Sequence, residues 1–83
     1  MRVAMTLDKK VEEIFALTFG IPPDQLSDSL SPDDVMGWDS LGHLKLVTAL
    51  SQELECEFEV QEIMEMENLA RIKEIVATHG VRQ

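Results

Sequence analysis

The chain has 83 residues, which is too short for a doubly wound sheet, an α/β barrel or a hydrolase sheet, since these need at least about 150 residues. Hydrophobic residues make up 45% of the sequence and charged residues 28%, and this globular composition argues against a disordered chain. Sixteen acidic residues against seven basic residues give a formal net charge of -9, so the surface repels nucleic-acid phosphates and anionic lipids. We therefore expect one small domain over residues 1–83, most simply a monomer, whose partners are proteins.

Cysteine content and apolar runs indicate the compartment. The single cysteine, Cys56, excludes an internal disulfide, and no spacing typical of a zinc site is present. The longest uninterrupted apolar run is Ile14-Phe15-Ala16-Leu17, far short of the ~20 residues that cross a bilayer. Asp8, Lys9 and Lys10 interrupt any apolar region of a signal peptide. These features predict a cytoplasmic protein that does not insert into a membrane.

Apolar residues at helical spacing predict a first helix over residues 6–19. Thr6 is placed to cap its start, and Gly20 to end it. Residues 20–38 are rich in proline, serine and glycine, which predicts a long loop with a short helical turn around Pro23–Leu26. Spaced along this loop are apolar residues that we expect to pin it onto the helices: Ile21, Leu26, Leu30, Val35, Met36 and Trp38.

A second helix is predicted from about Ser40 to Leu54, with a wide apolar face and with Asp39 or Ser40 as its cap. Residues 55–60 then alternate between charged and apolar side chains, as a strand does, but no second strand is present to pair with them. We interpret this stretch as an extended connector. Its inward-facing side chains are expected to be Cys56, Phe58 and Val60.

Two further helices complete the predicted fold. A short one spans residues 61–67, and a last one begins after Asn68 and ends near His79-Gly80. The core is expected to be aliphatic, with methionine filling the remaining gaps. Because methionine packs adaptably, Met36, Met64 and Met66 are candidates for core residues that could make room for an apolar chain. The predicted fold is all-α: a small bundle of three longer helices and one short helix, with a long ordered loop between the first and second helices.

The junction between the long loop and the second helix carries the most informative residues. Ser40 lies at the predicted helix start, where backbone N–H groups lack partners and the helix dipole is positive. Such a position favours a phosphate, either by direct contact or as a phosphodiester built on the hydroxyl. On spacing alone, the simpler interpretation is that Asp39 and Ser40 only cap the helix.

Asp39-Ser40-Leu41 resembles the signature of acyl carrier proteins, and the longer run from Trp38 to His43 is a common form of it among discrete bacterial carriers. Length, acidity and helix order follow the same plan over essentially the whole chain. The resemblance implies that a phosphopantetheinyl transferase joins a 4'-phosphopantetheine arm from coenzyme A to Ser40. The thiol of the arm then holds acyl groups as thioesters and presents them to enzymes that load and transfer them. The protein is therefore expected to be a carrier, the substrate of other enzymes and not a catalyst.

The resemblance also implies partner contacts around Ser40. Asp39 would lie next to the metal-bound active site of the transferase. Leu41 and Leu44 would be exposed apolar contacts for partner enzymes, although their spacing fits a helix core equally well.

Charge on the second helix departs from the usual pattern of housekeeping carriers, which place acidic residues just beyond the modified serine. Here those positions hold Gly42, His43 and Lys45. A basic patch on a partner enzyme would meet a neutral or positive surface, which lowers complementarity. We therefore expect Lys45 to contribute to partner recognition in a specialised lipid or polyketide-type pathway.

Other functions fit the sequence less well. Ser40 and His43 lie one helical turn apart, but the surrounding glycines do not match G-x-S-x-G, and we expect His43 to face solvent. No run begins a calcium-binding loop, and Asp39 with His43 alone is too few ligands for a metal site. An unmodified acidic helical adaptor, and a peptidyl or aminoacyl carrier, remain alternatives.

Overall fold

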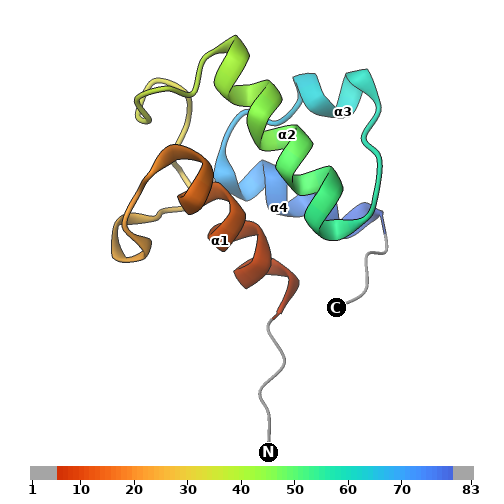
Figure 1. The fold of residues 1–83 in the computed structure, drawn as a ribbon, viewed down its shortest axis with the longest axis horizontal. Helices are drawn as coiled ribbons and strands as arrows, with labels where there is room; N and C mark the ends of the chain where they lie inside the picture. The colour runs from red at the N-terminus through yellow and green to blue at the C-terminus, as the bar shows by residue number, and fades with distance from the viewer. Residues whose placement is uncertain (1–5, 80–83) are drawn as a thin grey trace, which may run out of the picture.

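A computed structural model describes residues 6–79 of the chain and contains no strand among them (Figure 1). The loop between the first two helices contains a single 3-10 turn, η1 (Pro23–Gln25), as expected. The all-α fold of three longer helices, one short helix and a long ordered loop is confirmed. The helices are α1 (Leu7–Phe19), α2 (Ser40–Leu54), α3 (Val60–Met64) and α4 (Leu69–Thr78).

Helix ends follow from their capping residues. The Thr6 hydroxyl accepts a hydrogen bond from the backbone of the third residue of α1, and Gly20 ends that helix in the left-handed conformation at φ 67°. Asp39 caps α2, and Asn68 caps α4. α4 ends at Thr78, close to the predicted end, while Gly80 lies outside the described residues.

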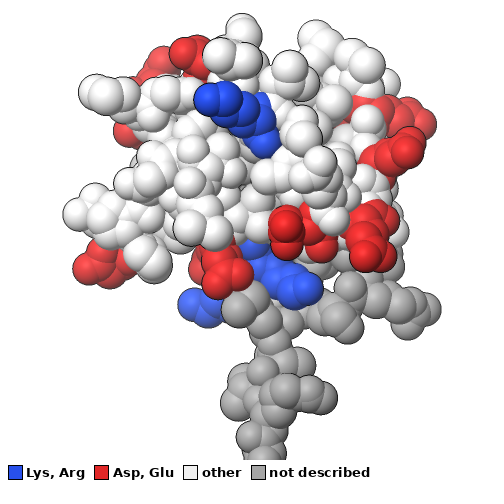
Figure 2. Space-filling model, in the orientation of Figure 1, with Lys and Arg blue, Asp and Glu red and all other residues white. Residues whose placement is uncertain are grey.

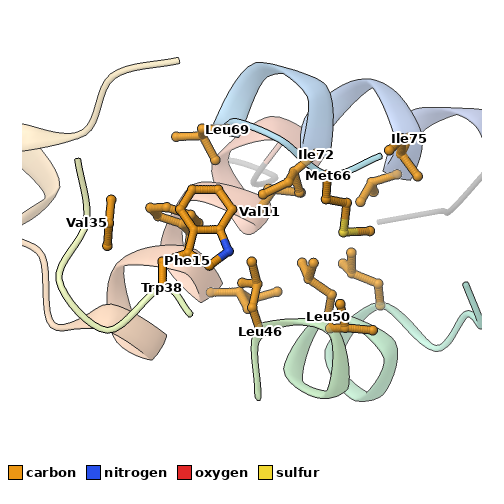
Figure 3. Close-up of a cluster of buried hydrophobic side chains, with 14 residues drawn as sticks. Val11, Phe15, Val35, Trp38, Leu46, Leu50, Met66, Leu69, Ile72 and Ile75 are labelled. Carbon is orange, nitrogen blue, oxygen red and sulfur yellow. The ribbon is translucent and has the colours of Figure 1, made fainter. Parts of the chain in front are cut away.

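The core lies where α1, α2 and α4 turn their apolar faces toward one another (Figure 3). Fully burying one valine, leucine, isoleucine, phenylalanine or methionine side chain contributes about 1.5–3 kcal/mol to the stability of the fold. Trp38 is only 3% exposed and brings the end of the long loop into this core, with its ring 5.1 Å from that of Phe15. The largest fully buried side chains are Phe15, Leu46, Leu50, Leu69, Ile72, Val11 and Val76.

The long loop is held against the start of α4 by backbone hydrogen bonds. The carbonyls of Asp28 and Leu30 accept hydrogen bonds from the first two residues of α4, at 2.9 and 3.1 Å. The Lys73 ammonium adds contacts of 2.7 Å to both Asp28 and Glu12, and so connects the loop to α4 and α1. These contacts explain how a loop of this length keeps one conformation.

The predictions for Val60, Met36 and Met64 were wrong. Val60 is 73% exposed, because the chain turns into α3 at this residue, whereas Cys56 and Phe58 pack partly against the core as expected. Met36 is 94% exposed and Met64 is 75% exposed, so neither fills core space and Met36 does not pin the loop. Met66, which is 3% exposed, is the one of the three candidate methionines that lies in the core.

Candidate functional site

Ser40 is the first residue of α2, and its side chain is exposed. The carboxylate of Asp39 accepts a hydrogen bond of 2.9 Å from the backbone N–H of Gly42, which fixes the first turn. By their position, the N–H groups of Ser40 and Leu41 have no acceptor within the helix. They lie at the positive end of a 15-residue helix, so this hydroxyl is placed where an attached anionic group is stabilised.

Gly42 brings the loop into close contact with the first turn of α2. A Cβ atom at this position would lie 1.9 Å from the carbonyl oxygen of Gly37 and 3.1 Å from the ring of Phe19. Gly42 is buried, so an acidic side chain cannot occupy it without moving the loop. Positions 42, 43 and 45 lack the acidic residues of housekeeping carriers, and at position 42 the packing leaves no room for one.

His43 does not face solvent, and that prediction was wrong. The indole N–H of Trp38 donates to its Nδ1 at 2.8 Å, and its Nε2 lies 2.7 Å from the carbonyl oxygen of Ile63. The two rings are stacked at 21°, with centroids 6.0 Å apart. Because both ring nitrogens are engaged, His43 cannot serve Ser40 as a general base, which removes the hydrolase alternative. Helical spacing carries no signal for this arrangement, since the partner on α3 is 20 residues away.

Exposed apolar side chains flank Ser40 on two helices. Leu41 is 64% exposed and Leu44 is 59% exposed, so both project from α2 and neither belongs to the core. Met64 projects from α3 and is 75% exposed. In Figure 2, the surface over the first half of α2 is mostly uncharged, with a basic patch on it and acidic groups toward the edges.

A surface hollow of about 620 Å³ lies beside Ser40. Its walls come from three parts of the chain: residues 31–33 of the loop, the start of α2, and the end of α3 with the residues that follow it. Apolar residues of α3 and Met66 line the hollow, and so do Asp39, Ser40 and His43. A flexible chain attached to the Ser40 hydroxyl has room to lie here.

Acidic residues are distributed unevenly around the site. α2 has no acidic residue between Asp39 and Glu53, whereas seven occur in residues 53–67. Within this acidic segment, burial and then the Glu62 carboxylate raise the pKa of the Cys56 thiol. Cys56 therefore stays protonated at neutral pH, and it is a poor nucleophile for an acyl group.

The described part of the chain shows neither a metal-binding cluster nor a membrane-spanning helix. In residues 6–79, no three histidine, cysteine, aspartate or glutamate side chains gather as a metal site requires. No helix among these residues is both long and apolar enough to cross a membrane.

The tripeptide Asp-Ser-Leu occurs a second time, at Asp28-Ser29-Leu30. Ser29 lies in a turn of the long loop and not at a helix start, and its hydroxyl is 2.9 Å from that of Ser27. The Asp28 carboxylate pairs with Lys73, and Leu30 packs partly against the core. The structure thus separates two segments that share the same three letters.

Comparison with known protein families gives a match that covers most of the chain. The model of a family described as "Phosphopantetheine attachment site" matches residues 9–76. The matched region runs from the first turn of α1 into the last turns of α4 and includes both the hollow and the start of α2.

Proposed function

The chain belongs to the family of domains that carry a phosphopantetheine attachment site, and from that membership we propose that Ser40 is the residue that carries the arm. Domains of this family hold 4'-phosphopantetheine covalently and generally act as carriers, not as catalysts. The observation that supports Ser40 is its exposed hydroxyl at the first position of a long helix. Ser29, in the second copy of the tripeptide, lacks that setting.

Attachment joins the Oγ atom of Ser40 to the phosphorus of pantetheine phosphate. The bond from this phosphorus to the nucleotide half of coenzyme A breaks, and the transferase takes up the hydroxyl proton. The resulting phosphodiester is anionic, and the α2 N-terminus stabilises it by its dipole and its free N–H groups. We further propose that Asp39, which caps the same turn, lies next to the metal-bound active site of the transferase.

The hollow beside Ser40 suits the neutral part of the arm. Its lining includes apolar residues of α3 and Met66, which suit the methylene groups of the arm, and polar residues such as Ser31, which suit its amides. The thiol at the end of the arm holds acyl groups as thioesters, and loading and transferring enzymes act on them there. Cys56 does not compete, because burial keeps its thiol protonated.

Mass spectrometry tests the assignment of Ser40. The full chain is incubated with coenzyme A and a broad-specificity phosphopantetheinyl transferase, and its intact mass is measured. We expect a gain of one phosphopantetheinyl unit for the natural chain and for Ser29→Ala, and no gain for Ser40→Ala. An unchanged mass of the natural chain with several competent transferases would favour an unmodified helical adaptor instead.

We also propose that the enzymes served by this carrier belong to a specialised lipid or polyketide-type pathway. The support is the face of α2 next to Ser40, which is apolar at Leu41 and Leu44 and basic at Lys45. A partner surface rich in arginine and lysine would gain little from this face. An acyl carrier is favoured over a peptidyl or aminoacyl carrier by the strong net acidity and by the Asp-Ser-Leu form of the motif.

The partner set is tested by adding acidic groups to α2 where they can reach a partner. Position 42 is closed by Gly37, so the test uses Lys45→Glu combined with Thr48→Glu, both at exposed positions. The loaded carrier is assayed with enzymes of fatty acid synthesis at low ionic strength. We expect poor activity of the natural chain and higher activity of the double variant, whereas full activity of the natural chain would contradict the proposal.

A further inference from the structure

α3 depends on contacts from outside the helix to hold its position. It has five residues and none of them is buried. A helix this short is unstable by itself, because too few hydrogen bonds offset the cost of ordering the backbone. Val60 and Met64 point into solvent, and Ile63 packs only partly against the core. Polar contacts must therefore supply much of what keeps this helix in place.

Two histidines contact α3 from different helices. His79, after the end of α4, lies 2.9 Å from the Glu62 carboxylate. His43, in the first turn of α2, lies 2.7 Å from the carbonyl oxygen of Ile63. Among residues 6–79, His43 is the α2 side chain that hydrogen-bonds to α3, and it does so three residues after Ser40.

The partners of His43 determine its protonation. A carbonyl oxygen can only accept, so Nε2 carries the hydrogen that is donated to Ile63. The indole N–H of Trp38 can only donate, so Nδ1 carries a lone pair. Both requirements are met by a single species, the neutral imidazole with hydrogen on Nε2. The ring thus links the buried end of the long loop, the start of α2 and the end of α3 through one side chain.

We propose that His43 is a positioning residue that fixes α3 beside Ser40 for the enzymes acting on the arm. The bridge from Trp38 through His43 to Ile63 joins the part of the hollow formed by the start of α2 to the part formed by α3, and His43 itself lines that hollow. It thereby fixes the position of α3, with the exposed Met64, relative to the start of α2, where Leu41 is exposed. The inference rests on the proposed function of Ser40.

Loss of the bridge leaves α3 with the contact between Glu62 and His79 but with no side-chain hydrogen bond from α2 among the described residues. The Ser40 hydroxyl and the first turn of α2 keep their geometry, because Asp39 caps that turn independently of the ring. An enzyme that binds both helices then meets an unorganised surface and has to order it on binding. Loss of the bridge should therefore raise the KM of the transferase for this protein and change kcat much less.

Nuclear magnetic resonance of the unaltered chain tests the bridge directly. Trp38 is the single tryptophan, so its indole N–H gives one unambiguous signal. We expect a scalar coupling across the hydrogen bond between the indole nitrogen and Nδ1 of His43, and nitrogen shifts of the Nε2–H species at neutral pH. The absence of this coupling, or the Nδ1–H species, would overturn the proposal.

Variants test the positioning role in the full chain. His43→Leu removes both hydrogen bonds, while His43→Gln keeps one acceptor and one donor on a side chain of similar reach. His79→Leu is the matched control, because it cuts the contact of α3 with α4 and spares the bridge. Circular dichroism establishes that each variant is folded before it is assayed, and the resonance measurement on the unaltered chain decides the proposal if His43→Leu is unfolded.

Two readouts are compared. For His43→Leu we expect faster hydrogen exchange at the backbone of α3 and a KM for the transferase raised about fivefold, with kcat within about twofold. We expect His43→Gln to recover most of the loss and His79→Leu to keep the KM of the natural chain. Equal KM values for His43→Leu and the natural chain, or equal increases for His43→Leu and His79→Leu, would overturn the inference. If the natural chain gains no mass on incubation with coenzyme A and a transferase, the proposed function fails. The resonance and exchange measurements would still show whether the bridge through His43 forms.

Discussion

Two segments of this chain share the tripeptide Asp-Ser-Leu, and the fold treats them in opposite ways. At residues 28–30 the aspartate pairs with Lys73, the serine lies in a loop turn and the leucine packs partly against the core. At residues 39–41 the aspartate caps a helix, the serine begins it and the leucine is 64% exposed. The first segment supports the fold, and the second faces outward.

With Ser40 as the proposed attachment site, the two segments differ in structural setting and not in their three letters. A helix start with unpaired N–H groups stabilises an attached phosphate, and an exposed apolar residue is available to a partner enzyme. Both conditions come from the 15 residues of α2 that follow, and not from the tripeptide. Matched substitutions in the two segments can therefore separate structural from functional roles.

The leucines should show the largest difference in stability. Leu30→Ala removes apolar contacts with the core and is expected to lower the free energy of unfolding by roughly 2 kcal/mol, the low end for a buried leucine. Leu41→Ala on the exposed face is expected to change it by less than about 0.5 kcal/mol. Urea unfolding measures both. Equal losses for the two variants would contradict the burial described for these segments.

The ion pair of the first segment should give the next largest effect. Lys73→Met removes hydrogen bonds of 2.7 Å to Asp28 and Glu12 from a side chain that is 12% exposed. We expect a loss of about 1.5 kcal/mol in the free energy of unfolding. The control is Lys45→Met, at an exposed position for which no ion pair is found among the described residues. The prediction fails if the two variants are equally stable.

The stability that Lys73 contributes through Asp28 and Glu12 should decrease only at high pH. Burial disfavours the charge of Lys73, but its hydrogen bonds to Asp28 and Glu12 outweigh burial and raise its pKa. A lysine whose pKa is raised by folding contributes stability that is complete below its unfolded value of about 10.4 and is lost as the pH rises through the folded value. The difference between the natural chain and Lys73→Met should therefore be constant from neutral pH to about pH 10 and shrink above that.

The cap of the second segment should give the smallest loss of stability. Asp39→Ala removes the acceptor for the N–H of Gly42 and is expected to cost about 1 kcal/mol. Asp39→Asn keeps an acceptor oxygen and should be close to the natural chain in thermal unfolding. If the carboxylate lies next to the metal of the transferase, Asp39→Asn is nevertheless modified slowly. If the transferase modifies Asp39→Asn as fast as the natural chain, Asp39 only caps the helix and has no role at the transferase active site.

Patterns along the sequence predicted the helices and their order, but not which side chains of the short helix face the core. Periodic apolar residues and good caps placed α2 at Ser40–Leu54, because a helix of four turns buries a face that spacing alone defines. α3 has no buried residue, so periodicity could not orient it, and Val60 and Met64 were placed on the wrong side. The site serine follows from the motif and its helix start. The bridge through His43 does not, since it joins residues that only the folded chain brings together.

Localising the modification within the chain is the most direct test of Ser40 as the residue that carries the arm. The modified protein is digested, and tandem mass spectrometry identifies the peptide and residue that carry the phosphopantetheinyl group. We expect the group on Ser40 alone and never on Ser29, although each serine lies between an aspartate and a leucine. Modification of Ser29, or of any residue while Ser40 is unmodified, would contradict it.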